Sequence, residues 1–272
     1  ITKNVNDAIQ FCIKNNSIHY IKPIIRVNFE INNSINQIDL LDIHDITNIN
    51  ANAGLNIGML LAAGTSSRFV SDCKNDNCKP KQLYVLNDLP IIIYSIDAMI
   101  DMVDELVIVT NSDCLDEIKI LIQSYEKIVL LVNDINCRLE SIEVGLDYIK
   151  NRHNNIKNII IHDSARPFIT KNHINELLIS CETYPYSQYY LKLVNGLCKD
   201  NYKMVNREQY IEICTPLCAN FDIFYFIFMN YITKKNRIVY EHIPILDILK
   251  IKYNLLIGSQ LHFRKITYFN DV

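Results

Sequence analysis

The residues with the clearest chemical potential form a short loop of small and hydroxyl-bearing side chains that ends in an arginine. The run Leu61-Ala62-Ala63-Gly64-Thr65-Ser66-Ser67-Arg68 follows an apolar stretch, so we expect a strand to end at the small residues and the chain to turn at the glycine. Backbone N–H groups in such a turn can surround a phosphate, and Arg68 offers a two-pronged donor for phosphate oxygens. Taken alone, the run is also compatible with an ordinary loop between a strand and a helix.

A second basic segment follows at Lys79-Pro80-Lys81-Gln82. Pro80 stiffens the backbone before Lys81, whose ammonium group is a compact positive charge suited to an anion. The glycine spacing matches neither the GxxxxGK[ST] loop of P-loop proteins nor the GxGxxG loop of dinucleotide-binding proteins. The two segments together therefore predict a phosphate site of another class.

The elements that must hold these segments alternate between strands and helices. We expect strands at residues 56–62, 106–110, 128–132 and 156–161. We expect helices at residues 90–102, 114–125, 141–150 and 171–181. Such alternation is typical of a parallel sheet in an α/β fold. In these sheets ligands bind beyond the carboxyl ends of the strands, which is where the polar motifs fall.

Several motifs in order along residues 56–270 resemble one known family. After Leu-Ala-Ala-Gly…Arg…Pro-Lys-Gln come Arg138-Leu139-Glu140-Ser141-Ile142-Glu143-Val144-Gly145-Leu146 and His162-Asp163-Ser164-Ala165-Arg166-Pro167. Shorter matches follow at Asn206-Arg207, Thr215-Pro216 and Gly258-Ser259…Lys265-Ile266-Thr267. The set resembles the cytidylyltransferases that act on 2-C-methyl-D-erythritol 4-phosphate or D-ribitol 5-phosphate. The Asp-Ser-Ala-Arg-Pro-Phe run leans slightly toward the ribitol-type members.

The resemblance implies a fold and a reaction. The implied fold is a Rossmann-like, GT-A-like nucleotidyltransferase: a three-layer α/β sandwich with a mostly parallel central sheet and a small β-arm at about residues 185–215. The implied reaction joins CTP to a polyol phosphate and releases pyrophosphate. Because acceptor-binding residues of this family reach the site of a neighbouring subunit through the arm, a homodimer is also implied.

The resemblance also assigns roles to individual residues. Arg68, Lys81 and Lys265 would be catalytic, and Asp163 would bind Mg²⁺, a hard ion that prefers carboxylate and phosphate oxygens. Arg207 and Thr215 would bind the acceptor. The CTP-binding residues would be Ala62, Ala63, Gly64, Thr65, Ser66, Arg138, Ser141 and Ser164. Ser141 is also expected to cap the amino end of its helix, and Asp163 has the alternative of a purely capping role.

The chain departs from the family pattern at several of these places. Ser66 stands where a glycine is expected, and the stretch between Arg68 and Pro80 is longer than usual. Asn206 replaces an aspartate, Leu217 a glutamine, and His262 an acid that would precede Lys265 by three positions. Two alternatives to the active cytidylyltransferase therefore stay open: a catalytically degenerate nucleotide-binding protein, and a nucleotidyltransferase for another sugar phosphate.

Composition sets the wider limits. The chain has 272 residues, of which 49% are hydrophobic, and a net charge of −3, which argues against nucleic-acid or membrane-surface partners. No apolar run approaches the roughly 20 residues of a membrane span, and residues 1–10 do not resemble a secretory signal. Nine scattered cysteines predict free thiols in a reducing cytoplasm. We expect residues 56–272 to form the cytidylyltransferase domain, with residues 1–55 as an extension of unassigned role.

Overall fold

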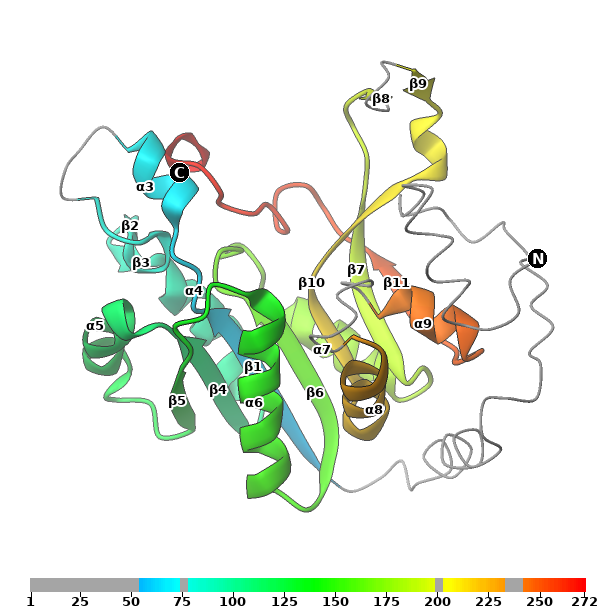
Figure 1. Cartoon of the computed structure of the whole chain (residues 1–272), viewed down its shortest axis with the longest axis horizontal. Helices are drawn as coiled ribbons and strands as arrows, with labels where there is room; N and C mark the ends of the chain where they lie inside the picture. The colour runs from blue at the N-terminus through cyan, green and yellow to red at the C-terminus, as the bar shows by residue number, and fades with distance from the viewer. Residues whose placement is uncertain (1–53, 74–77, 199–202, 233–241) are drawn as a thin grey trace.

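The computed structural model describes residues 54–73, 78–198, 203–232 and 242–272. The helical spacing of Val5, Ala8, Ile9 and Cys12 predicts a helix at residues 4–15, and residues 21–31 are predicted to form a strand. Both segments lie outside the described residues. In the described part, strands and helices alternate as the sequence predicts (Figure 1).

The strands are β1 (Leu55–Ala62), β2 (Val85–Leu86), β3 (Leu89–Pro90), β4 (Glu105–Thr110), β5 (Ile128–Val132), β6 (Ile156–Asp163), β7 (Tyr186–Lys192), β8 (Leu197–Cys198), β9 (Met204–Val205), β10 (Ile211–Asn220) and β11 (Asn254–Ile257). The α-helices are α3 (Ser67–Asp72), α4 (Ile91–Met99), α5 (Ser112–Ile122), α6 (Arg138–Arg152), α7 (Lys171–Cys181), α8 (Phe221–Tyr231) and α9 (Ile243–Ile248). Short 3-10 turns are η1 (Lys81–Leu83), η2 (Ile100–Met102), η3 (Arg207–Gln209) and η4 (Phe269–Asp271).

Seven strands form one central sheet in the order β11-β7-β10-β6-β1-β4-β5. β1 pairs in parallel with β4 and β6, and β4 pairs in parallel with β5. β10 is antiparallel to both of its neighbours, whereas β11 is parallel to β7. Only β10 therefore runs against the common direction of this sheet, and the predicted mostly parallel sheet is confirmed.

Both faces of the sheet are buried under helices, which makes three layers. Alternate residues of β1 face opposite sides: Ile57, Met59 and Leu61 pack with α6, α8 and α9, whereas Leu60 and Ala62 pack with α4, α5 and α7. This is the period-two pattern of a strand that is apolar on both faces. The predicted α/β sandwich is confirmed, and the carboxyl ends of β1 and β6 meet at one edge of it.

The helix around Ser141 differs from the expectation at its amino end. Helix α6 begins at Arg138 with Cys137 in the capping position, so Ser141 lies inside the helix and is not its cap. The preceding turn is closed by Asn133, whose side-chain oxygen accepts the N–H of Ile135 at 3.1 Å. Because that turn already directs the chain into the helix, the helix starts three residues earlier than predicted.

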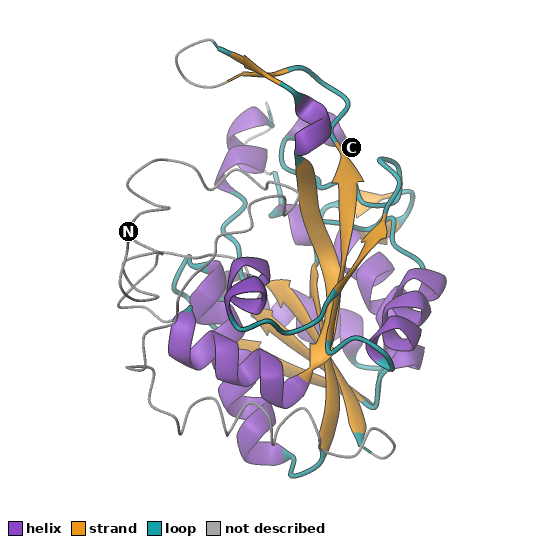
Figure 2. Ribbon diagram, turned by 90° about the vertical axis from the view of Figure 1, so that its right-hand side faces the viewer, coloured by secondary structure: helices purple, strands orange, loops and turns teal. Residues whose placement is uncertain are grey.

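The β-arm is a long hairpin that leaves the sheet beyond β7 and β10. Its tip carries the small antiparallel pair β8–β9, in which Leu197 lies opposite Val205. Both views show the arm projecting away from the helices and the sheet (Figures 1 and 2). Most of β7 and β10 pairs within the central sheet, so the projecting part is shorter than the predicted 185–215.

Candidate functional site

The candidate site lies where β1 and β6 end side by side. Their register places Leu61 opposite Asp163, and the N–H of Ser164 donates to the carbonyl of Leu61 at 3.0 Å. The phosphate-loop candidate follows β1, and the His-Asp motif closes β6. The parallel sheet therefore brings together two motifs that are about a hundred residues apart in the sequence.

The carbonyl groups of the loop after β1 are held by two amide side chains. The side-chain amide of Gln82 donates to the carbonyls of Ala62 at 3.1 Å and Gly64 at 3.3 Å, and that of Asn111 donates to the carbonyl of Ala63 at 3.3 Å. In a trans peptide the next N–H points opposite to the carbonyl. The N–H groups that follow these carbonyls therefore point away from the two amides. A methyl group added at Gly64 would meet no atom within 4 Å. This arrangement suits an anion such as phosphate.

Ser66 closes the loop in a left-handed backbone conformation, with φ 57° and ψ 21°. The family pattern has a glycine at this position, and glycine adopts that conformation more readily than serine. Its hydroxyl is buried and donates to Gln82 Oε1 at 2.9 Å, and it accepts the N–H of Lys81 at 3.1 Å. Ser66 thus ties the loop to the Lys-Pro-Lys-Gln segment, whereas Thr65 is exposed.

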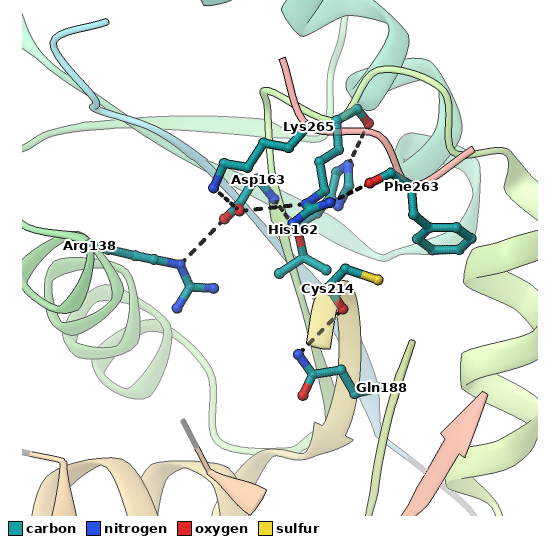
Figure 3. Close-up of polar contacts among 9 residues, drawn as sticks. Arg138, His162, Asp163, Gln188, Cys214, Phe263 and Lys265 are labelled. Carbon is teal, nitrogen blue, oxygen red and sulfur yellow. Dashed lines mark hydrogen bonds and ion pairs between the residues drawn. The ribbon is translucent and has the colours of Figure 1, made fainter. Parts of the chain in front are cut away.

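Asp163 is the centre of a cluster of positive side chains (Figure 3). Lys265 Nζ lies 2.9 Å from its Oδ2, Arg138 Nε lies 3.4 Å from its Oδ1, and Arg166 Nε lies 4.0 Å from Oδ2. The N–H of Asp163 also donates to the hydroxyl of Thr215 at 3.3 Å. The next helix along the chain, α7, starts at Lys171 with Thr170 as its capping residue, so the capping alternative for Asp163 is wrong.

The charges in this cluster set the protonation of Asp163. Burial by itself raises the pKa of this carboxyl, but Arg138, Lys265 and Arg166 outweigh burial and hold the pKa well below its usual range. The group is therefore ionised at neutral pH. One carboxylate fixed in this way can organise several cations around an anionic ligand.

Lys81 and Arg68 belong to the same electrostatic neighbourhood. Burial lowers the pKa of Lys81, and the charges of Lys265 and Arg68 lower it further, whereas Asp163 raises it. Arg68 lies exposed on α3, in the first turn after Ser66. The structure therefore brings together all three residues predicted to be catalytic and the predicted metal ligand.

Arg166 is a buried cation. It belongs to the motif that begins at His162, but we did not predict it as a site residue. Its guanidinium donates to the carbonyl of Phe263, and the N–H of Ile266 donates to the carbonyl of Ala165 at 2.8 Å. These contacts on both sides of Lys265 hold its segment against the end of β6. The only signal for this role was the Arg-Pro pair that follows His-Asp.

His162 stabilises the same corner from within the core. Its ring is fully buried, and Nε2 lies 3.1 Å from the carbonyl oxygen of Arg166. Burial lowers the pKa of His162 to about 4, so the ring is neutral near pH 7. The residue acts as packing beside the site.

Two serines predicted to bind CTP are buried at the edge of the site. The hydroxyl of Ser141 accepts from the amide of Asn133 at 3.0 Å and donates to the carbonyl of Cys137 at 3.3 Å. Ser164 is also buried. Ser141 lies four positions after the capping residue Cys137. Its contacts thus fix the turn that presents Arg138.

The two predicted acceptor residues lie in different places. Thr215 is buried beside Asp163, whereas Arg207 lies in η3 on the arm, where its guanidinium donates to the carbonyl of Val194. Eight residues separate them, which is at most about 26 Å of extended chain at about 3.3 Å per residue. Within one chain, the structure does not bring Arg207 to the Asp163 cluster.

Comparison with known proteins agrees with this geometry. The family model "2-C-methyl-D-erythritol 4-phosphate cytidylyltransferase" (IspD) matches residues 57–225, which is more than half of the chain and includes the loop, Lys81, Arg138 and Asp163. The chain belongs to the IspD family. It is therefore a nucleotidyltransferase of the cytidylyltransferase kind.

Individual relatives support the assignment to the IspD family. The chain is 27% identical to the 2-C-methyl-D-erythritol 4-phosphate cytidylyltransferase of Caldicellulosiruptor bescii over 225 residues, which cover 79% of this chain and 92% of the relative. It is 27% identical to the protein of the same description from Thermotoga neapolitana over 174 residues, which cover 62% of this chain and 74% of the relative.

Solved structures of similar fold include 4-diphosphocytidyl-2C-methyl-D-erythritol synthase from Anaerococcus prevotii. It has a TM-score of 0.65 and 17% identity, with 80% of this chain and 92% of that chain covered. The bifunctional IspDF of Campylobacter jejuni has a TM-score of 0.63 and 19% identity, with 80% and 53% covered. At these identities the structures support the fold alone.

At the centre of the IspD-family site, the cations surround the carboxylate of Asp163. Within residues 54–73, 78–198, 203–232 and 242–272, no group of three or more His, Cys, Asp or Glu side chains is placed to hold a metal ion. His262 stands at the position of an expected acid, and its ring nitrogen Nδ1 is hydrogen-bonded to the Ser259 hydroxyl at 2.9 Å. The family pattern has a further acidic residue, for which Glu241 is the candidate in this sequence, and Glu241 lies outside the described residues. In the same described ranges, no helix has the length and apolar character needed to cross a membrane.

Proposed function

We propose that this chain transfers the cytidylyl group of CTP to 2-C-methyl-D-erythritol 4-phosphate and releases pyrophosphate. The observation that carries the proposal is a group of five cationic side chains at the ends of β1 and β6. Lys81, Arg138, Arg166 and Lys265 interact with the ionised carboxylate of Asp163, and Arg68 lies in the electrostatic neighbourhood of Lys81. The cations of this group need more negative charge than one carboxylate can supply. A triphosphate and a sugar phosphate together bring that charge. The excess of cations suits a site in which both phosphates meet.

The proposed steps follow from what these side chains can do. The phosphate oxygen of the acceptor attacks the α-phosphorus of CTP, the bond to the bridging oxygen breaks, and pyrophosphate leaves with its electrons. Lys81 and Arg68 bind the triphosphate and neutralise charge that develops on it. Lys265, fixed against Asp163, binds the reacting phosphates from the other side. Positioning and charge stabilisation therefore provide most of the catalysis.

The remaining predicted CTP contacts surround this centre. We assign the cytosine and ribose to the backbone of Ala62, Ala63 and Gly64, to Arg138, and to the helix end held by Ser141. Thr65 is exposed beside them. Ser66 and Ser164 are buried and fix the conformation of the loop through their hydrogen bonds. Because the hydroxyls of Ser66 and Ser141 already have protein partners, their contribution is to fix backbone groups that face the nucleotide.

The donor set is compatible with a magnesium ion that is shared with the nucleotide. Mg²⁺ usually keeps several waters and binds one or two carboxylates together with substrate phosphates. Asp163 supplies one such carboxylate, already ionised and 11% exposed. When bound, the ion would supply charge neutralisation at the phosphates. We therefore propose Asp163 as its protein ligand.

The projecting arm supports a homodimer in which Arg207 of one copy serves the acceptor site of the other. Arg207 lies on the arm, eight residues along the chain from Thr215, yet both are proposed to bind the acceptor. A second copy of the chain would resolve this separation. We further propose that residues 56–272 form the catalytic domain and residues 1–55 an extension.

The test is pyrophosphate release with CTP and Mg²⁺, measured with each acceptor in turn. Turnover with 2-C-methyl-D-erythritol 4-phosphate and at least about tenfold lower kcat/KM with D-ribitol 5-phosphate, a difference of about 1.4 kcal/mol in transition-state binding, supports the proposal. The reverse order would assign the ribitol acceptor. Binding of CTP without turnover on either acceptor would favour the catalytically degenerate alternative, and turnover with another nucleotide or sugar phosphate would favour the third.

A further inference from the structure

A small hydrogen-bonded network joins the two basic segments on which the proposed chemistry depends. Ser66 Oγ donates to Gln82 Oε1 at 2.9 Å and accepts the backbone N–H of Lys81 at 3.1 Å. Gln82 Nε2 in turn donates to the carbonyls of Ala62 and Gly64 at 3.1 Å and 3.3 Å. We call the side chains of Ser66 and Gln82 with these contacts the Ser66–Gln82 clip.

The chemistry of the groups fixes how the clip is oriented. An amide has two donor hydrogens on nitrogen and an acceptor on oxygen. Nε2 faces the two carbonyls and the sulfur of Cys114 at 3.2 Å, and Oε1 faces a hydroxyl, so every contact of Gln82 joins a donor to an acceptor. The opposite orientation would place Oε1 against two carbonyl oxygens. Gln82 is almost completely buried, at 1% exposed, so water cannot replace these bonds.

The backbone at Ser66 shows that the hydroxyl has a specific use. The residue adopts φ 57°, where a side chain is disfavoured and glycine is not. A glycine would relieve that strain but could make neither of the two hydroxyl bonds. Strain that persists at a site calls for a functional hypothesis, and the hydroxyl bonds to Gln82 and Lys81 supply one.

We propose that Ser66 and Gln82 are positioning residues that set where Lys81 stands relative to the loop of residues 62–66. The inference rests on the proposed function, because Lys81 matters there as the cation that meets the triphosphate. Neither Ser66 nor Gln82 needs to touch the reacting atoms. Their effect passes through the backbone of Lys81, which is anchored directly by the Ser66 hydroxyl and through its neighbour by the side chain of Gln82.

The first experiment compares Ser66→Gly and Ser66→Ala with the wild type. Both remove the hydroxyl, but Ser66→Gly also removes the backbone strain. A displacement of about 1 Å can cost as much as 100-fold in rate, so we expect kcat to fall by about 10- to 100-fold in both variants, while KM for CTP changes less. Because Ser66→Gly also relieves the backbone strain, its midpoint of thermal unfolding should be above that of Ser66→Ala. Unchanged kcat in both variants would overturn the proposal.

A matched control separates this effect from the loss of any buried hydroxyl. Ser187 is fully buried on β7, and its hydroxyl donates to that of Ser180 at 2.8 Å, away from the cluster. Ser187→Ala should lower thermal stability and leave kcat unchanged. Gln82→Glu should behave like Ser66→Ala, because a carboxylate cannot donate to the carbonyls of Ala62 and Gly64.

A double-mutant cycle with Lys81→Ala tests whether Ser66 acts through Lys81. If it does, adding Ser66→Ala to Lys81→Ala should change kcat by less than about twofold, because coupled residues are not additive. Additive losses would show that the clip acts elsewhere and would overturn the proposal.

A labelling measurement keeps the inference testable without turnover. In Ser66→Ala, acetylation of Lys81 by a limiting amount of acetic anhydride, followed by peptide mass spectrometry, should become several-fold faster, with the exposed Lys79 as internal reference. If the wild type shows no turnover while Lys81 labelling responds to Ser66→Ala, the proposed function fails and the clip stands. Labelling of Lys81 that is equal in both proteins would overturn the clip.

Discussion

Lys265 and Asp163 are 102 positions apart in the sequence, yet the Lys265 ammonium nitrogen lies 2.9 Å from the Asp163 carboxylate. The pair connects a segment after β11 to the end of β6. The Arg166 guanidinium donates to the carbonyl of Phe263. Buried contacts as well as charge therefore position Lys265 next to Asp163.

Removing the carboxylate should therefore affect both stability and turnover. Asp163→Asn keeps the shape of the side chain but leaves Arg138, Arg166 and Lys265 without their anion. Because loss of one partner from a buried ion pair is costly, we expect the free energy of unfolding to fall by roughly 3 kcal/mol, and kcat to fall by at least about 100-fold. Asp116→Asn, at an exposed position of α5, is the control for both measurements. Retention of full kcat in Asp163→Asn would contradict the assigned role.

Lys81 should be essential for the chemical step and dispensable for folding. Because cations that stabilise developing charge typically contribute two orders of magnitude or more, Lys81→Ala should lower kcat by at least about 100-fold. Steady-state kinetics and thermal unfolding would be compared with Lys79→Ala, whose exposed partner is Glu117. A kcat equal to that of the wild type would remove Lys81 from the proposed mechanism.

The proposed exchange of arms between two copies leads to a complementation test. Lys81→Ala and Arg207→Ala should each be nearly inactive with acceptor at low concentration. A mixed dimer has one site with both changes and one intact site, so random mixing should restore about a quarter of the wild-type rate per chain. No recovery, despite mixed dimers detected by native mass spectrometry, would place Arg207 in the site of its own chain or outside any site.

Acid should destabilise the fold through two buried imidazoles. Burial lowers the pKa of His162 to about 4 and that of His242 to about 3, whereas an exposed histidine titrates near 6.5. Below pH 6.5 the unfolded chain binds protons that the folded chain does not, so stability falls with pH. At pH 5 each ring should cost about 2 kcal/mol relative to pH 7.5.

His242→Phe isolates one of these two contributions. The ring stacks on Phe224 with centroids 4.0 Å apart, and its Nε2 is buried without a hydrogen-bond partner among the described residues. An aromatic hydrocarbon should therefore be tolerated at pH 7.5. Urea unfolding at pH 7.5 and pH 5 should show a smaller loss in the variant than in the wild type, and an equal loss would contradict the assignment.

Much of the sheet was predictable because β1, β5 and β6 are apolar runs bounded by polar residues. β7 and β10 were not, since the tyrosine-rich Tyr186–Lys192 and the proline-containing Ile211–Asn220 lack a clear period. Their pairing is decided by tertiary contacts. Helix α7 was predicted with its observed bounds, whereas α6 was shortened because Ser141 resembled a cap and the turn formed by Asn133 left no sequence signal.

The site was predictable where motifs fall at strand ends, as Gly64, Arg68, Lys81 and Asp163 do. The contacts that hold those residues were not. Gln82 and Asn111 secure the loop from 18 to 48 positions away, and Arg166 secures Lys265 through a carbonyl. Such contacts depend on distances that arise only when the elements pack.

The imbalance between five cationic side chains and one carboxylate has a consequence for the encounter with ligands. The chain carries a net charge of −3, so the cluster is a local reversal of sign on an acidic molecule. Its field should steer polyanions toward the edge of the sheet and speed their association. Since mobile ions shorten the reach of such a field to about 8 Å near 0.15 M ionic strength, the rate of nucleotide capture should depend steeply on salt.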